Sequence, residues 1–223
     1  MGNYDKFASE YAKGTETIPS EIEARNHYHS LLPGDLEGKV LLDVGCGSGH
    51  DVRYYAGLGA KANGIDLSER EIELAKAQQI GEFRVGNMNQ LPYSSNEFDF
   101  VTSWYALQAS DDVPKALNEM VRVAKPKATI LVLAKHPIRN LLEGWKNNGK
   151  MDYYEKAIVT SYIFNRTITL NEPRHTMMEY LNPILLQDAE LQLLEERTDF
   201  PGSEQVIPGM QYPTHFIMKL QKK

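Results

Sequence analysis

The sequence has little cysteine, no excess of basic residues and no long apolar run. Its 223 residues include one cysteine, Cys46, so the chain can form no internal disulfide. Acidic residues outnumber basic ones by 30 to 24, and the net charge of −6 disfavours a nucleic-acid partner, whose phosphates require a basic face. No apolar run approaches the roughly 18 residues that cross a membrane. These absences predict a cytoplasmic protein with neither a nucleic-acid nor a membrane partner.

The chain also lacks repeats, low-complexity tracts and flexible linkers, which predicts a single domain over residues 1–223. Apolar spacing predicts two N-terminal helices, at 5–13 and 20–32, and a later helical segment near 174–187. Between them, apolar runs typical of buried parallel strands alternate with helical patterns. The expected strands are 39–44, 60–66, 82–85, 98–103 and 129–135, and the expected helices are 51–58, 68–79 and 113–123. This alternation predicts an α/β fold with a doubly wound sheet.

Two further strand-like runs, 191–198 and 215–220, close the chain and predict an antiparallel pair at one edge of the sheet. Ser68 followed by Glu71 has the spacing of a capping box and predicts the start of the helix at 68–79.

A glycine-rich loop follows the first central strand, in the run Asp43-Val44-Gly45-Cys46-Gly47-Ser48-Gly49. Glycines at alternate positions permit positive φ angles and let a ligand approach the backbone. In open α/β sheets the ligand lies at the carboxyl ends of the strands, where this loop is expected. A dinucleotide site is one candidate, but its fingerprint requires a third glycine at the position of His50. A tight structural turn without a ligand is the other alternative.

Acidic residues near this loop narrow the choice of ligand. Asp43 precedes the loop and would repel a pyrophosphate, whereas it suits a ligand with an ammonium group. Asp66 ends the second strand, about twenty residues on, where a carboxylate accepts hydrogen bonds from ribose hydroxyls. Asp66 alone does not separate NAD from other ribose-containing ligands, and it could instead cap the helix that begins near Ser68.

Three runs carry a resemblance to a known family: VLLDVGCGSGHDVRYYAGLGAKANGIDLSEREIELAK (40–76), GNMNQLPYSSNEFDFVTSWYALQ (86–108) and ALNEMVRVAKPKATILVLAKHP (116–137). They resemble the small class I S-adenosylmethionine (SAM)-dependent methyltransferases of the "type 11" group. The resemblance implies a Rossmann-like, mostly parallel seven-stranded sheet with an antiparallel edge strand. It also implies a monomeric or homodimeric enzyme and SAM as the methyl donor.

The resemblance also implies roles for individual residues. The methionine end of SAM would be lined by Asp43, Gly45, Gly47, Gly49 and Ser103. Asp66 would hold the ribose, and Leu67, Asn87 and Met88 would contact the adenine. Tyr11, in the N-terminal helical segment, is a further candidate for the cofactor's carboxylate. The SAM-binding core would span about 36–137, and a helical, aromatic-rich cap would comprise about 3–32 and 138–182.

Methyl transfer needs a positioned nucleophile, a water-excluding site and, for a protonated acceptor, a general base. His136, Tyr105 and His175 are the candidate bases, and His136 is favoured because it ends the fifth strand. No Cys/His/Asp cluster has metal-ligand spacing, so no metal is expected. The predicted function is methyl transfer from SAM to a small molecule. The alternatives are a SAM-binding protein without transferase activity and an NAD-dependent oxidoreductase.

Overall fold

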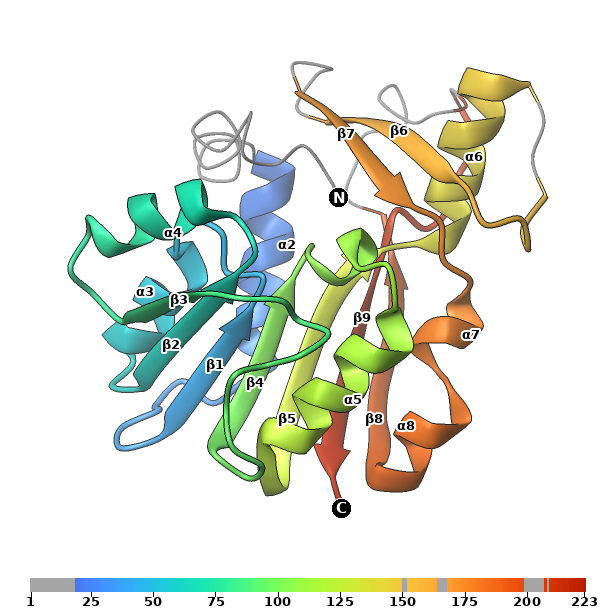
Figure 1. Cartoon of the computed structure of the whole chain (residues 1–223). Coiled ribbons are helices and arrows are strands. Elements are labelled where there is room, and N and C mark those ends of the chain that lie inside the picture. Colours follow the sequence, from blue (N-terminus) through green and yellow to red (C-terminus); the bar gives the residue numbers. More distant parts are fainter. Residues whose placement is uncertain (1–18, 150–151, 164–167, 199–206, 208) are drawn as a thin grey trace.

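The structure is a computed structural model that describes residues 19–149, 152–163, 168–198, 207 and 209–223. Helices and strands alternate along the chain from α2 to β3, after which β4, β7 and β9 each follow another strand directly (Figure 1). The helices are α2 (Pro19–Ser30), α3 (His50–Gly57), α4 (Glu69–Lys76), the 3₁₀ turn η1 (Leu107–Ala109), α5 (Val113–Val123), α6 (Pro137–Asn148), α7 (Met177–Tyr180) and α8 (Pro183–Asp188). The strands are β1 (Val40–Val44), β2 (Lys61–Asp66), β3 (Glu82–Val85), β4 (Phe98–Trp104), β5 (Ala124–Lys135), β6 (Ile158–Ile163), β7 (Ile168–Pro173), β8 (Ala189–Arg197) and β9 (His215–Lys222).

Seven strands form one sheet in the order β3-β2-β1-β4-β5-β9-β8. The pairs among β1 to β5 are parallel, whereas β9 runs antiparallel to both β5 and β8. The predicted mostly parallel α/β sheet is therefore confirmed, and so is the antiparallel pair at one edge. The strand order reverses between β1 and β4, and ligands of such sheets bind in the crevice beside this switch point.

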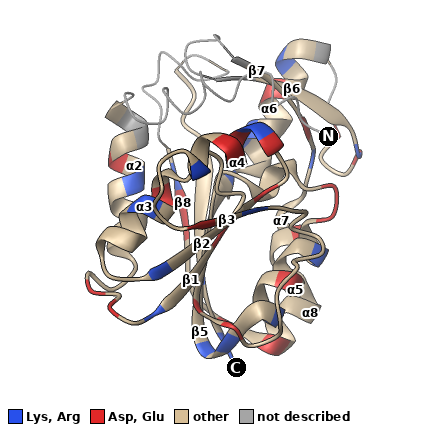
Figure 2. Cartoon of the chain, turned by 60° about the vertical axis from the view of Figure 1, so that its left-hand side comes forward, with Lys and Arg blue, Asp and Glu red and all other residues tan. Residues whose placement is uncertain are grey.

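Two apolar cores flank the sheet because successive residues of a buried strand point to opposite faces. Leu41 packs with Tyr55 and Ile72 under α3 and α4, while its neighbour Leu42 packs with Leu117 under α5. Leu41, Leu42, Leu117 and Tyr55 are fully buried. Charged residues of both signs are interspersed on the outer elements, and the central strands are largely uncharged (Figure 2).

Helix α2 lies against a face of the sheet. Tyr28 is fully buried, and its hydroxyl lies 3.1 Å from the carbonyl oxygen of Ser103 in β4 and 2.8 Å from that of Leu131 in β5. Tyr28 belongs to the same apolar core as Tyr55 of α3, and its hydroxyl contacts carbonyl oxygens of two strands. Helix α2, the described part of the first predicted cap segment, therefore contributes to a core rather than to the cap. Residues 1–18, including the predicted helix at 5–13, lie outside the described residues.

The second predicted cap segment does lie over the carboxyl ends of the parallel strands, where α6 and the β6–β7 hairpin stand above the main sheet (Figure 1). The hairpin was not part of the predicted helical, aromatic-rich cap, so this prediction is corrected. Its buried positions alternate as a strand requires, but they include Ser161 and Glu172 beside Val159 and Leu170. These polar residues interrupt the apolar alternation that identifies a strand in sequence.

Candidate functional site

The glycine loop connects β1 to α3, and Gly45, Gly47 and Gly49 all have positive φ angles, of 74°, 49° and 81°. A Cβ on Gly45 would lie 2.1 Å from the Cβ of Ala106, and one on Gly49 would lie 2.7 Å from the ring of Phe83. Packing therefore requires glycine at those two positions. A Cβ on Gly47 would meet only the carboxylate of Glu71, at 3.7 Å, so packing does not require glycine here and the positive φ does.

Asp66 joins the glycine loop to the end of β2. One carboxylate oxygen accepts from the backbone N–H of Gly47 at 2.9 Å, and the other accepts from the N–H of Ser68 at 2.9 Å. The N-cap of α4 is Ser68, whose hydroxyl accepts from the N–H of Glu71 at 3.0 Å. Asp66 is therefore more than a helix cap, because it sets the spacing of two loops at the carboxyl edge.

Asp43 is a buried acid below the same loop, with 2% of its surface exposed. The hydroxyl of Thr102 donates to it at 2.8 Å. Burial is the main cause that raises the pKa of Asp43 well above its usual value, and the neighbouring Asp51 adds to it. A cation bound at the loop would favour the ionised carboxylate.

Exposed apolar side chains continue the edge beyond Asp66. Leu67 is 46% exposed and Val85, at the end of β3, is 45% exposed. Asn87 is exposed, and its side-chain oxygen accepts from the N–H of Asn89 at 2.8 Å. Met88 reaches the glycine loop, since its Cε would lie 3.8 Å from a Cβ on Gly45. These residues provide an apolar edge next to a carboxylate, which fits an aromatic base carried on a ribose.

Two of the predicted cofactor residues do not join this edge. Ser103 is fully buried, and its hydroxyl donates to the carbonyl oxygen of Val44 at 2.8 Å, so its side chain links β4 to β1 instead of facing the crevice. Tyr11 lies outside the described residues.

His136, the favoured base, has both ring nitrogens engaged. Nδ1 accepts from the N–H of Ile138 at 3.1 Å, which makes His136 the N-cap of α6. Nε2 then carries the proton and donates to Glu196 at 2.9 Å. Burial lowers the pKa of His136, although Glu196 opposes the shift. Because both nitrogens have partners within the protein, this geometry disfavours His136 as a base, and its role stays a prediction.

Tyr105 follows β4 and is held in an unusual backbone conformation. Its φ is 46°, in the left-handed region that non-glycine residues rarely adopt. The N–H of Tyr105 donates to the carbonyl oxygen of Leu133 at 2.8 Å. The side-chain amide of Gln108 donates to the carbonyl oxygen of Tyr105 at 2.5 Å. Strain of this kind is held by surrounding structure and clusters at functional sites. Tyr105 remains a candidate residue at the switch point.

His175 follows β7 and is 6% exposed, and neither ring nitrogen has a hydrogen-bond partner. Its Nδ1 lies 3.7 Å from Glu179, which is beyond hydrogen-bonding range. Burial lowers the pKa of His175, so the ring is neutral at neutral pH and can accept a proton. Unlike those of His136, the ring nitrogens of His175 have no hydrogen-bond partner among the residues that the structure describes.

A buried ionic cluster at the end of β5 was not predicted. Lys135 donates to Glu172 of β7 and to the hydroxyl of Ser161 of β6, the latter at 2.6 Å, and lies 3.5 Å from Glu143 of α6. Arg139 donates to Glu143 at 3.1 Å. All five side chains are at most 6% exposed. The cluster fastens the cap to the sheet, and no local sequence signal indicates it, because its members come from four elements.

A second buried cluster joins α2 to α3. Asp51 accepts from Arg25 at 2.8 Å and lies 2.8 Å from Nε2 of His29. The guanidinium of Arg25 also lies 4.7 Å from the ring centre of Trp104, at the end of β4. These contacts hold α2 against α3 and the end of β4. Asp51 is the structural partner of His29.

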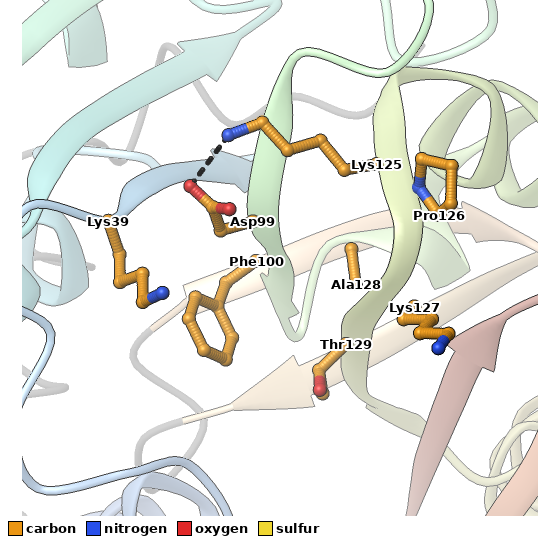
Figure 3. Close-up of a pocket in the computed structure, with 8 residues that line it drawn as sticks. All are labelled: Lys39, Asp99, Phe100, Lys125, Pro126, Lys127, Ala128 and Thr129. Carbon is orange, nitrogen blue, oxygen red and sulfur yellow. Dashed lines mark hydrogen bonds and ion pairs between the residues drawn. The ribbon is translucent and has the colours of Figure 1, made fainter.

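The pocket in Figure 3 lies at the opposite, amino-terminal edge of the sheet. It has a volume of about 210 Å³ and is lined by Lys39, Asp99, Phe100 and the start of β5, residues 125–129. Lys125 donates to Asp99 at 2.9 Å. None of its residues comes from the glycine loop, so we do not assign it to the site.

Within the described residues, no group of three or more His, Cys, Asp or Glu side chains is arranged to hold a metal ion. None of the helices in this part of the chain is long and apolar enough to cross a membrane.

Residues 42–132 match the model of a protein family described as a methyltransferase domain. The chain is 30% identical over 148 residues to a malonyl-acyl-carrier-protein O-methyltransferase from Pectobacterium atrosepticum, covering 65% of this chain and 54% of that protein. It is 36% identical over 114 residues to a demethylmenaquinone methyltransferase from Lactococcus lactis, covering 47% and 45%. The chain thus spans about half the length of these relatives.

A crystal structure of an S-adenosylmethionine-dependent methyltransferase from Mesorhizobium loti has the same fold. The TM-score is 0.70 at 19% identity, and the match covers 88% of this chain and 96% of the other. The matched sequence segment, 42–132, contains the glycine loop, Asp66 and the strained turn after β4.

Proposed function

We propose, from the premise that residues 42–132 form a methyltransferase domain, that this chain transfers a methyl group from SAM to a small-molecule acceptor. The observation that carries the proposal is the cradle formed by the backbone at Gly47 together with Asp66. When bound, SAM supplies a methyl group activated by a sulfonium. The residues of this chain position the two reactants and keep water away.

The residues present fit SAM. Bare backbone at Gly47 leaves room for the methionine end, and Asp43 favours its ammonium group. Asp66 would hold the ribose, and Leu67, Asn87 and Met88 would hold the adenine. The turn from Tyr105 to Ala106 packs against the glycine loop and would border the methyl group.

SAM and S-adenosylhomocysteine are expected to bind, and NAD is not. His50 occupies the place of the third glycine of a dinucleotide fingerprint, and Asp43 would repel a pyrophosphate. Isothermal titration calorimetry with each ligand tests this. Tight NAD binding without heat from SAM would overturn the assignment. SAM binding without methyl transfer to a metabolite panel would instead favour a SAM-binding protein without transferase activity.

Asp66→Ala is expected to weaken SAM binding by about 1–3 kcal/mol, the size of a lost charge-assisted hydrogen-bond pair. The variant should remain folded, because the carboxylate lies at a strand tip. Calorimetric titration measures the affinity and circular dichroism checks the fold. Glu73→Ala, which removes an exposed carboxylate paired with Arg70 on the nearby helix α4, is the matched control. Equal SAM affinity in the two variants would limit Asp66 to ordering the loops.

The acceptor is a small molecule in this proposal, and SAM-dependent methylation takes place in the cytoplasm without a nucleic-acid or membrane partner. The net charge of −6 and the interspersed charges of Figure 2 support these points. We assign a monomer or homodimer, which size-exclusion chromatography with light scattering tests.

A further inference from the structure

A cavity of about 310 Å³ lies between the turn after β4 and the base of the β6–β7 hairpin. Its lining residues are Asp111, Lys156, Ala157, Ile158, Pro173, Arg174 and His175. None of them belongs to the cofactor residues named above. The cavity nevertheless shares a wall with the cofactor side, because Asn89 donates to Asp111 at 2.6 Å and Asn87 accepts from Asn89.

The turn 105–112 separates the cavity from the glycine loop. At one end of the turn, Ala106 packs against Gly45, and at the other end Asp111 lines the cavity. Ser110 donates to the side-chain oxygen of Asn89 at 2.9 Å, which fixes this part of the turn. The cavity and the cofactor cradle thus lie on either side of one short, well-anchored segment.

Arg174 is a buried cation without a counter-ion. It is 7% exposed, and its guanidinium donates to the carbonyl oxygen of Asp152. Within the described part of the chain, no carboxylate forms an ion pair with it. Buried charges in proteins are normally paired, because an uncompensated one is costly. A guanidinium in this state at the wall of a cavity favours the binding of an anion in that cavity.

His175 is the second unsatisfied group of the cavity, since both of its buried ring nitrogens lack partners. As a neutral imidazole it offers one donor and one acceptor. Lys156 lies at the rim with its side chain 84% exposed, and its ammonium lies 3.5 Å from Glu179. Asp111 and the nearby Glu179 are negative, so a dianion such as a phosphate is repelled more than a single carboxylate.

We propose that this cavity binds the carboxylate group of a small organic acid, held by the guanidinium fork of Arg174, with a hydrogen-bonding group of the acid placed at His175. Arginine pairs with a carboxylate through two parallel hydrogen bonds, which sets the orientation of the ligand as well as its affinity.

The test is calorimetric titration of the full chain with 4-hydroxybenzoate, a probe that carries one carboxylate and one hydroxyl. We expect 4-hydroxybenzoate to bind at least tenfold more tightly than the neutral 4-hydroxybenzamide. Arg174→Gln should reduce its affinity at least tenfold. Arg70→Gln, which removes the same charge from an exposed pair with Glu73, should leave the affinity unchanged.

Thermal unfolding distinguishes a ligand site from a structural role of Arg174. Removing an unpaired buried charge should leave the melting temperature of Arg174→Gln unchanged or raise it. If that variant does not fold, Lys156→Gln carries the test, because its exposed side chain can be removed without disturbing the core. It should weaken 4-hydroxybenzoate binding severalfold.

Three results would overturn the proposal: no binding of 4-hydroxybenzoate at millimolar concentration, equal binding of its amide, or full affinity in folded Arg174→Gln. Tighter binding of phenyl phosphate than of benzoate would overturn the assignment of a carboxylate. S-adenosylhomocysteine binding is measured on the same samples. Carboxylate binding without S-adenosylhomocysteine binding would contradict the proposed function and leave the cavity assignment standing, and the reverse result would contradict the cavity assignment alone.

Discussion

Lys135→Ala is expected to lower the free energy of unfolding by about 3–5 kcal/mol, the cost of breaking a buried ion pair by removing one partner. Lys135 is 3% exposed, and its ammonium forms an ion pair with Glu172, which is 1% exposed. Without it, Glu172 remains buried and ionised or must take up a proton. Urea unfolding monitored by circular dichroism measures the change.

Lys125→Ala provides the control for this prediction. Lys125 pairs with Asp99 at 2.9 Å, but their side chains are 38% and 25% exposed, so its loss should cost less than about 1 kcal/mol. Equal destabilisation by the two substitutions would show that the buried cluster contributes no more than a surface pair. Because Ser161 and Glu172 belong to the hairpin, Lys135→Ala should also expose the cap to proteolysis before the rest of the chain.

Gly45→Ala is expected to destabilise the protein by about 2–5 kcal/mol and to abolish measurable SAM binding. The added methyl would lie 2.1 Å from the Cβ of Ala106, and overpacking of this kind costs about 1–3 kcal/mol. The φ of 74° adds about 1–2 kcal/mol for a residue with a side chain. Relieving the clash would push the turn after β4 away from the cradle.

The double variant Gly45→Ala/Ala106→Gly separates these two costs. Removing the methyl of Ala106 relieves the clash but leaves the positive φ, so part of the stability and of the SAM affinity should return. Gly34→Ala is the matched control, because a Cβ there meets nothing within 4 Å and its φ is not positive. Urea unfolding and SAM calorimetry report the outcome. If Ala106→Gly restores nothing, contact between the two loops does not determine the site.

Much of the sheet was predictable because its signals are local. Adjacent residues such as Leu41 and Leu42 are both apolar, and this pattern identifies a strand covered on both faces. Ser68 has the spacing of an N-cap, and the structure confirms that it caps α4. The hairpin was missed because Ser161 and Glu172 occupy buried positions where a strand pattern would have apolar residues. Without a strand pattern in this segment, the sequence predicts a helical cap.

The candidate site likewise has features that the sequence predicts and features that depend on the fold. The positions of Gly45, Gly47, Gly49 and Asp66 relative to the strands were predictable from their spacing. The reason why glycine is required at each position was not predictable from the sequence. Ala106 leaves no room for a side chain at Gly45, and Phe83 leaves none at Gly49. His136 was favoured as a base from its place at the end of β5. Its engagement with Glu196 depends on β8, sixty residues further along the chain.

The alternation of strands and helices in the core, the edge of the sheet at which the glycine loop lies and the backbone freedom of that loop were predictable from the sequence alone. Each of these follows from residues a few positions apart, through the periods of strands and helices and the conformational freedom of glycine. The tertiary structure alone decided which polar groups have partners. Lys135 pairs with Glu172 and His136 with Glu196. Among the described residues, Arg174 meets no counter-ion and the ring of His175 meets no hydrogen-bond partner. Such pairings depend on which distant segments meet in the fold, and no local pattern encodes them.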